Sequence, residues 1–220
     1  MKEILLKAEN FVLKSLNKNL KSAFVYHTFS HTQFVVSKIN EIIKNENITD
    51  EEKEIVLLSG WLHDIGYTVG KTKHEDNSIV IAKDFLTKEG YDEYKIQQIL
   101  ACINATKLNE TPLNLLQEII CDADFAHFAS KNYNKLANQL REEFENTDCG
   151  TFTNIEWMKE NIAVFKQHKY YTKFAILNWN IAKSENLISI KKELEKATKK
   201  ANQKIISENR FERSIDTQFL

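Results

Sequence analysis

The sequence predicts an all-α fold, a single helical bundle of about nine or ten helices. Five glycines and one proline in 220 residues leave few positions for the tight turns that sandwiches and barrels need. Apolar residues recur at helical spacing from the beginning of the chain, at Ile4, Ala8, Phe11 and Val12. The length is enough for one domain with a substantial core. We expect that domain to span residues 1–190, with residues 191–220 as its C-terminal helical extension.

Helices in the first half of the chain are assigned from periodicity and end signals. Residues 1–20 form an amphipathic helix, and a second helix runs from the Tyr26–Thr32 segment to about Ile43. Thr49 precedes three acidic residues and is a typical N-cap for a third helix, which ends at His63-Asp64. Residues 67–76 are the most loop-like stretch, and the helix that follows stops at Gly90.

The second half is assigned in the same way. A helix is expected from about Glu93 to Asn104, and Pro112 is placed in the first turn of the next helix, which runs to Ala129. Residues 131–147 are helical and highly charged, and residues 148–150 break the chain. Thr153 caps the helix that follows, and 168–171 interrupt again. We expect two helices between residues 172 and 208.

Composition limits the partners and the compartment. Thirty basic and 31 acidic residues give a net charge of −1, so nothing in the charge favours nucleic acid as an obligate partner. Three scattered cysteines do not suggest a disulfide framework or a structural zinc site, and they fit a reducing compartment. No apolar run is long enough for a signal peptide or a membrane span. We therefore expect a cytoplasmic protein that is a monomer or a homodimer.

Candidate metal ligands cluster around the His63-Asp64 dipeptide, which ends an apolar helical run just before Gly66. Imidazole and carboxylate groups are common ligands of divalent metals. His27 and His31 are four residues apart and share a face if their helix has already started at His27.

Two further segments could supply ligands. His74-Glu75 opens another helix from the loop. Asp122 and Asp124 lie in an otherwise apolar helix, where an unpaired buried carboxylate is costly and a metal ion would be a suitable partner.

The order of these residues resembles the HD-domain superfamily of metal-dependent phosphohydrolases. That family's pattern is a histidine, a His-Asp pair and a later aspartate, which converge on a divalent metal inside a helical bundle. The matching positions are His31, His63, Asp64 and Asp124. Asp124 is preferred because the family aspartate commonly follows a small residue, here Ala123; Asp122 stays open as the alternative.

The resemblance implies one tightly held ion. Mn²⁺ or Fe²⁺ is expected, with Mg²⁺, Ni²⁺ or Zn²⁺ as other occupants, and the open coordination positions would allow a water to be activated. Segment Asn104-Ala105-Thr106 lacks the histidine that many two-metal members have, although His74 could contribute. Asp64, or Asp122 if it is not a ligand, would accept the water's proton.

A second resemblance concerns His27. The segment Tyr26-His27-x-x-x-His31 is similar to a segment of cyclic-nucleotide phosphodiesterases, in which the earlier histidine protonates the leaving oxygen. This implies that His27 is a catalytic general acid.

Substrate contacts are expected from residues near the ligands. Lys71, Lys73 and Lys107 lie in loops next to ligand-bearing segments and could neutralise phosphate, and His74 and Glu75 are further candidates. The expected substrate, a small-molecule phosphate ester such as a nucleotide or cyclic nucleotide, comes from the resemblance.

Residues 102–124 also resemble a bacterial subgroup of HD proteins. Some of its members are fused to nucleotide cyclases or to membrane segments in antiphage cyclic-nucleotide signalling. The end of the chain, 210–220, is similar to the juncture that precedes membrane segments in fused members. This keeps an alternative open: an HD module that binds metal, senses a nucleotide without turnover and signals to a partner or fused segment. A third possibility is an inactive helical scaffold.

Overall fold

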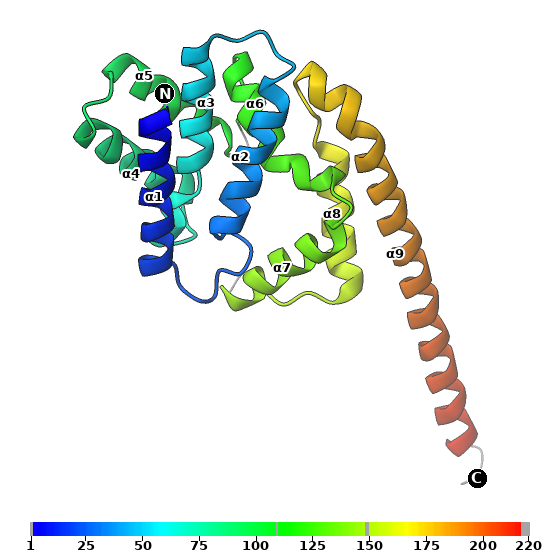
Figure 1. The fold of residues 1–220 in the computed structure, drawn as a ribbon. Coiled ribbons are helices and arrows are strands. Elements are labelled where there is room, and N and C mark those ends of the chain that lie inside the picture. The colour runs from blue at the N-terminus through cyan, green and yellow to red at the C-terminus, as the bar shows by residue number, and fades with distance from the viewer. Residues whose placement is uncertain (1, 109, 148–149, 217–220) are drawn as a thin grey trace.

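The computed structural model describes residues 2–108, 110–147 and 150–216, with side chains for 3–108, 110–147 and 150–204. Over these residues the chain forms nine α-helices, two 3-10 helices and no strand, which confirms the predicted all-α class (Figure 1). In chain order the elements are α1 (Lys2–Asn19), α2 (Phe29–Ile43), α3 (Asp50–Leu62), η1 (Ile65–Thr68), α4 (His74–Lys88), α5 (Glu93–Ala105), α6 (Leu115–Asp124), η2 (Phe125–Ala129), α7 (Tyr133–Asn146), α8 (Asn154–Gln167) and α9 (Lys173–Asp216).

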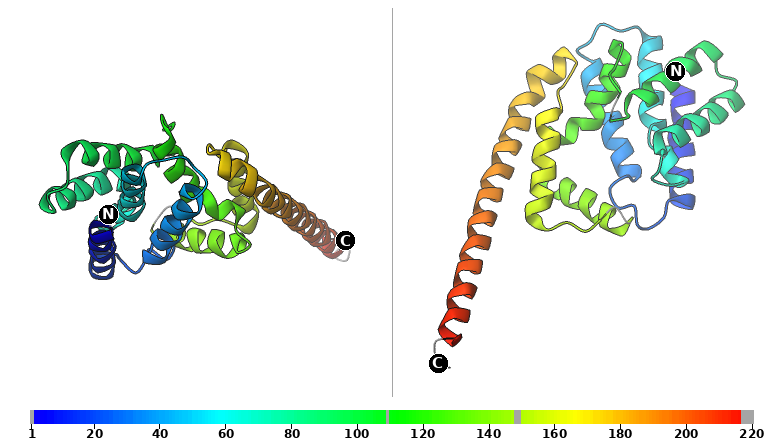
Figure 2. Two further views of the ribbon diagram at one scale, coloured as in Figure 1. Left: turned by 45° about the horizontal axis from the view of Figure 1, so that its top comes forward. Right: turned by 180° about the vertical axis from the view of Figure 1, so that it is seen from behind.

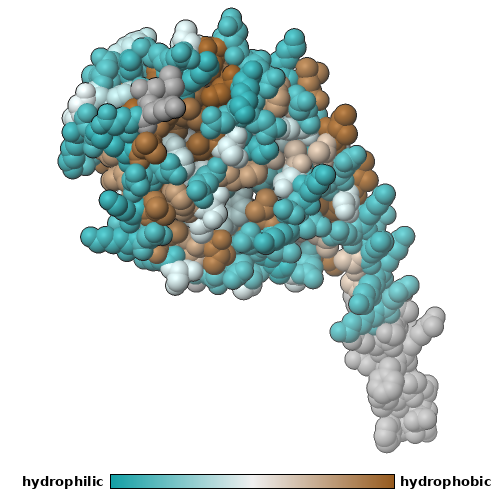
Figure 3. Space-filling model, viewed as in Figure 1, coloured by the Kyte–Doolittle hydropathy of each residue, from teal (hydrophilic) through white to brown (hydrophobic). Residues whose placement is uncertain are grey.

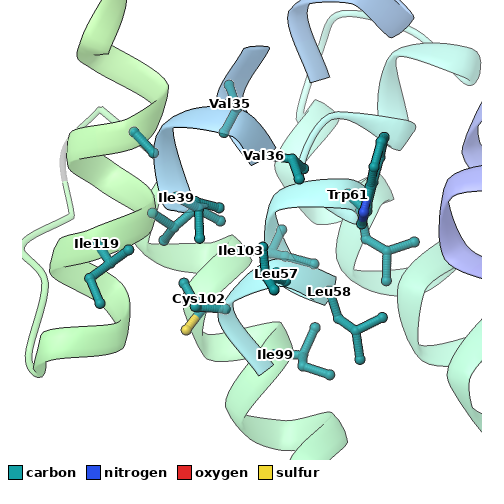
Figure 4. Packing of buried hydrophobic residues seen from close by; sticks show 14 of the residues in the cluster. Val35, Val36, Ile39, Leu57, Leu58, Trp61, Ile99, Cys102, Ile103 and Ile119 are labelled. Atoms are coloured by element: carbon teal, nitrogen blue, oxygen red, sulfur yellow. The ribbon is translucent and has the colours of Figure 1, made fainter. Parts of the chain in front are cut away.

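The main core lies between α2, α3, α5 and α6. Figure 4 shows Val35, Ile39, Leu58, Ile103 and Ile119 from these four helices converging on one apolar region. Helix α3 is buried over all of its C-terminal part, from Glu54 to Leu62. Burying each large aliphatic side chain stabilises the fold by about 1.5–3 kcal/mol. This packing fixes the C-terminal end of α3, where His63-Asp64 follows.

A second, smaller core lies between η2, α7, α8 and α9. Its buried residues are Phe128, Tyr133, Ala137, Ile162, Phe165 and Ile190. It holds α7 and α8 beside the site-bearing helices. The last part of α9 extends away from both cores (Figures 1 and 2).

Helix starts follow the predicted caps at two positions. Thr49 and Thr153 each form a capping box, in which the threonine side chain accepts from the third helical N–H and a glutamate side chain accepts from the threonine N–H. The helix predicted to open at His74 does begin there. These confirmed starts depend only on neighbouring residues.

Three predictions about helix bounds are wrong. Pro112 is not in the first turn of α6, because Asn114 is the N-cap and its side chain accepts from the N–H of Gln117. The helix expected to reach Ala129 changes to a 3-10 helix after Asp124. The two helices expected after residue 172 are one, α9, because no glycine or proline interrupts that segment.

Two predictions reach beyond the described residues. The break expected at 148–150 includes residues 148–149, and the terminal juncture segment 210–220 includes residues 217–220. Within the part that is described, no helix has both the length and the apolar character needed to cross a membrane.

The surface is mostly hydrophilic on the face in Figure 3, with apolar residues interspersed. The exposed apolar side chains of α9 include Ile176, Leu177 and Ile181, in the part of the helix nearest its start.

Candidate metal centre

Three helices, α2, α3 and α6, bring four side chains together. His31 lies in the first turn of α2, His63 and Asp64 follow α3, and Asp124 ends α6. Both histidines are buried, at 8% and 1% exposure, and Asp64 is 8% exposed. His63 Nδ1 lies 2.9 Å from the carbonyl of Gly60, which can only accept, so Nδ1 carries a proton and Nε2 faces the cluster.

The nitrogen and oxygen atoms of this cluster converge. Asp64 Oδ2 lies 3.3 Å from His31 Nε2 and 3.2 Å from His63 Nε2. Asp124 Oδ1 lies 3.3 Å and 3.7 Å from the same two nitrogens. The ligand atoms of His31, His63 and Asp124 all lie within 4.8 Å of one another. This set therefore forms a compact group of nitrogen and oxygen donors.

The donor atoms lack hydrogen-bond partners that would explain their burial. His31 Nε2, His63 Nε2 and Asp64 Oδ2 are inaccessible to solvent and make no well-aligned hydrogen bond within the described chain. Such atoms are rare in folded proteins because leaving them unsatisfied costs free energy. Imidazole nitrogens and carboxylate oxygens suit a divalent transition-metal ion. The residues present therefore fit such an ion.

The histidines and carboxylates of the cluster shift one another's pKa values. Burial lowers the pKa of His31, but the carboxylates of Asp124 and Asp64 outweigh burial and raise this pKa to about 9. Burial raises the pKa of Asp124, but His31 and His63 outweigh it and hold this pKa below its usual value. A cation at this position would compete with protons for the same atoms.

Asp122, the alternative ligand, has a different environment. Its carboxylate accepts hydrogen bonds from the N–H of Tyr171 at 2.9 Å and from the N–H and hydroxyl of Thr172 at 2.7 and 2.8 Å. Burial raises the pKa of Asp122 to about 6, although these hydrogen bonds oppose the shift. Asp122 therefore anchors the chain just before α9, and the geometry favours Asp124 as the residue turned toward the histidines.

His27 lies outside the helix, because α2 begins only at Phe29. Its ring centroid is nevertheless 5.5 Å from that of His31. Nδ1 of His27 shares a hydrogen bond with Glu143 Oε1, and Nε2 lies 3.2 Å from the hydroxyl of Tyr67. His27 is thus held from both sides beside the cluster.

Glu143 on α7 is a site residue that the sequence analysis missed. Besides contacting the His27 ring, it accepts from the N–H groups of Tyr26 and His27 at 2.8 and 3.0 Å, and it is fully buried. Although burial raises its pKa, His27 outweighs burial and lowers it. Its position seven residues after Leu136 and three after Leu140, on a face shared with apolar side chains, was the available signal.

Elements η1 and α4 contribute three side chains beside the cluster, those of Tyr67, His74 and Glu75. His74 Nε2 lies 3.8 Å from Asp64 Oδ1, and His74 Nδ1 lies 3.3 Å from Glu75 Oε2. The Tyr67 ring stacks with the His27 ring at a centroid distance of 4.2 Å and with the His74 ring at 4.1 Å. His74 and Glu75 therefore lie next to the cluster.

Gly66 permits this arrangement, because its lack of a side chain lets η1 approach α4 closely. A Cβ at Gly66 would lie 1.9 Å from the carbonyl oxygen of His74 and 2.7 Å from the N–H nitrogen of Ser78. We expect Gly66→Ala to lower the free energy of unfolding by about 1–3 kcal/mol, because backbone atoms must move. Gly70→Ala is the matched control, since a Cβ there meets nothing within 4 Å. Urea unfolding of both variants measures this, and equal stabilities would contradict the expectation.

The three candidate lysines occupy different places. Lys107 lines a cavity that reaches Asp124, and it pairs with Asp76 at 2.6 Å. Lys71 Nζ lies 3.9 Å from the centroid of the Phe144 ring, and Lys73 is exposed at the N-cap of α4 with a φ of 54°. The cavity lining, within the described residues, includes Lys107 but neither Lys71 nor Lys73.

Comparison with protein families gives one match. Residues 28–128 match the HD domain, a segment that contains all four cluster residues and begins immediately after His27. HD domains are generally metal-dependent phosphohydrolases. No curated protein and no solved structure matches the chain significantly. The match covers slightly less than half of the chain, and it supports the HD-domain superfamily for residues 28–128.

Proposed function

We propose that this protein is a metal-dependent phosphohydrolase that cleaves a phosphate ester, with a nucleotide or cyclic nucleotide as the expected substrate. The observation that carries the proposal is the convergence of His31 Nε2, His63 Nε2 and the Asp64 carboxylate as buried atoms without hydrogen-bond partners. Together with Asp124 they would hold the ion. When bound, the ion would supply Lewis-acid polarisation of the phosphoryl group and activation of a water.

The chain's own residues supply the proton transfers. The second carboxylate oxygen of Asp64, which lies on the His74 side of the cluster, would accept a proton from the attacking water. His27 would donate a proton from Nε2 to the leaving oxygen, because Glu143 binds its Nδ1 and keeps the ring oriented. His74, Glu75 and Lys107 are proposed to contact the substrate, and we retain Lys71 and Lys73 as weaker candidates.

We also propose a domain organisation and a family subgroup for this chain. We infer one HD-type domain over residues 1–190, extended by residues 191–220, in a cytoplasmic protein that is a monomer or homodimer. The continuous α9 supports the extension, because residues 173–216 form one helix whose last part extends away from both cores (Figure 2). The resemblance of residues 102–124 supports the cyclase-linked or antiphage subgroup.

The first test is removal and restoration of metal. The protein as purified should contain about one transition-metal ion per chain by mass spectrometry, and it should release phosphate from at least one nucleotide. Chelation should abolish release, and added Mn²⁺ should restore it. Metal together with saturable nucleotide binding but no turnover would instead favour the sensing module. Absence of metal under every loading condition would contradict the proposal.

A further inference from the structure

A cavity of about 290 Å³ lies directly beside the candidate metal centre. It is bounded by the end of α5 and the loop after it, by the end of α6, and by the segment that joins α8 to α9. Its lining includes Asp124, Phe125, His168 and Tyr171, with Lys107 and Lys169 among the basic residues. A cavity of about 150 Å³ can hold a benzene ring, so this one has room for a larger planar group.

Aromatic side chains form part of the cavity wall. The Phe125 and His168 rings stack with centroids 4.8 Å apart and an interplanar angle of 29°, and Tyr171 is a further aromatic in the lining. Phe125 follows Asp124 directly in the chain. A planar ring that stacks here would therefore be connected to a phosphate at the cluster by only a short linker.

His168 has a defined tautomer because of Lys183. The Lys183 ammonium lies 2.8 Å from His168 Nδ1 and also donates to the His168 carbonyl. An ammonium has no acceptor, so Nδ1 must accept and the proton of the neutral ring is on Nε2. Lys183 is buried, at 9% exposure, and among the described residues its ammonium makes hydrogen bonds to the ring and the carbonyl of His168. The positive charge of Lys183 therefore lies against His168.

The remaining ring nitrogen of His168 is available to a ligand. Nε2 makes no hydrogen bond to any described residue, and it is not among the atoms shielded completely from solvent. Burial, followed by the charge of Lys183, lowers the pKa of His168 to about 3, so the ring stays neutral at physiological pH. The cavity thus combines stacking surfaces with one fixed N–H donor.

We propose that this cavity binds the nucleobase of the substrate, stacked against Phe125 and Tyr171 and hydrogen-bonded through a base acceptor to His168 Nε2–H. Lys183 is a positioning residue that sets the tautomer of His168. The placement of the phosphate rests on the proposed function, whereas the base contacts do not depend on it. Nucleobases suit the site because each has two stacking faces and carbonyl or ring-nitrogen acceptors at its edge.

The first experiment uses probes that carry no phosphate and cannot be hydrolysed. Adenosine, guanosine, cytidine, uridine and ribose are titrated into the full-length protein and followed by NMR. At least one nucleoside should bind about 10-fold or more tightly than ribose, with shifts in the rings of Phe125 or Tyr171. Phe125→Leu and His168→Leu should each remove about 10-fold of this preference.

A second experiment tests Lys183 without requiring a ligand. ¹⁵N NMR of the His168 ring should show the Nε2–H tautomer in wild type and a mixture of tautomers in Lys183→Met. Lys166→Met, at an exposed lysine of α8, should resemble wild type. Lys183→Met should also reduce discrimination among the four nucleosides, an effect that simple loss of packing would not produce.

The results separate this inference from the proposed function. Nucleoside binding at this cavity without phosphate release from any nucleotide would leave the inference standing and overturn the hydrolase proposal. Four nucleosides that bind no more tightly than ribose would overturn the inference, as would a His168 ring with its proton on Nδ1 in wild type. The wild-type spectra remain decisive even if a variant fails to fold.

Discussion

Asp124→Ala is expected to abolish metal retention and reduce phosphate release to background. Asp124 Oδ1 lies 3.3 Å from His31 Nε2 and 3.7 Å from His63 Nε2, so its loss removes one member of the compact donor set. Residues that only orient metal ligands already cost 10–100-fold in affinity when mutated, so we expect a loss of more than about 100-fold for a ligand. Metal content after dialysis and phosphate release measure the effect.

Asp122→Ala is the matched comparison, two residues away on the same helix. It should retain metal but lose about 2–4 kcal/mol of stability, because the N–H groups of Tyr171 and Thr172 lose a buried charged acceptor. Chemical unfolding of the two variants separates the roles. If Asp122→Ala loses metal while Asp124→Ala keeps it, the ligand assignment is reversed.

Glu143→Gln is expected to lower kcat about 10²-fold for a phosphate ester with a poor leaving group. General acid catalysis contributes about 10²–10⁴-fold, and it requires that the His27 ring be correctly oriented. Glu143 orients it, since it binds Nδ1 and the N–H groups before α2. The measurement is kcat and KM on a nucleotide substrate found active in the panel.

A p-nitrophenyl phosphate ester provides the internal control, because its leaving group departs without a proton. Glu143→Gln and His27→Ala should affect this ester much less than the natural-type ester. Glu142→Gln, at the exposed neighbour of Glu143, should leave both rates unchanged. Equal losses on both esters would show that Glu143 acts on the fold and not through His27.

Local sequence signals predicted much of the helical framework. Thr49 and Thr153 were predicted as caps, and the structure shows that each forms a capping box with a glutamate three residues later. Pro112 was misplaced because a proline near a helix start is a weaker signal than the side-chain cap of Asn114. Two helices were predicted after residue 172, but the structure has the single α9, because no glycine or proline interrupts this segment. The interruption at His168–Tyr171 was predicted correctly.

Prediction of the site likewise depended partly on the sequence and partly on how the helices pack. His31, His63, Asp64 and Asp124 were proposed together from their order in the chain and a family resemblance, and the structure brings them within a few ångströms. Asp124 was preferred over Asp122 through the family resemblance alone, and Asp122 stayed open because both lie near the end of one helix. Their different partners are set by where α2 and the segment before α9 pack against α6.

The sequence by itself determined the all-helical class and most helix starts, because these depend on spacing along a few turns. It indicated the candidate ligands through their order in the chain and a family resemblance. Only the tertiary structure decided that Glu143 meets His27 across 116 residues and that Lys183 directs the tautomer of His168. Such contacts depend on how packed helices face one another. Periodicity shows which face of a helix is buried, and only packing decides which partner that face meets.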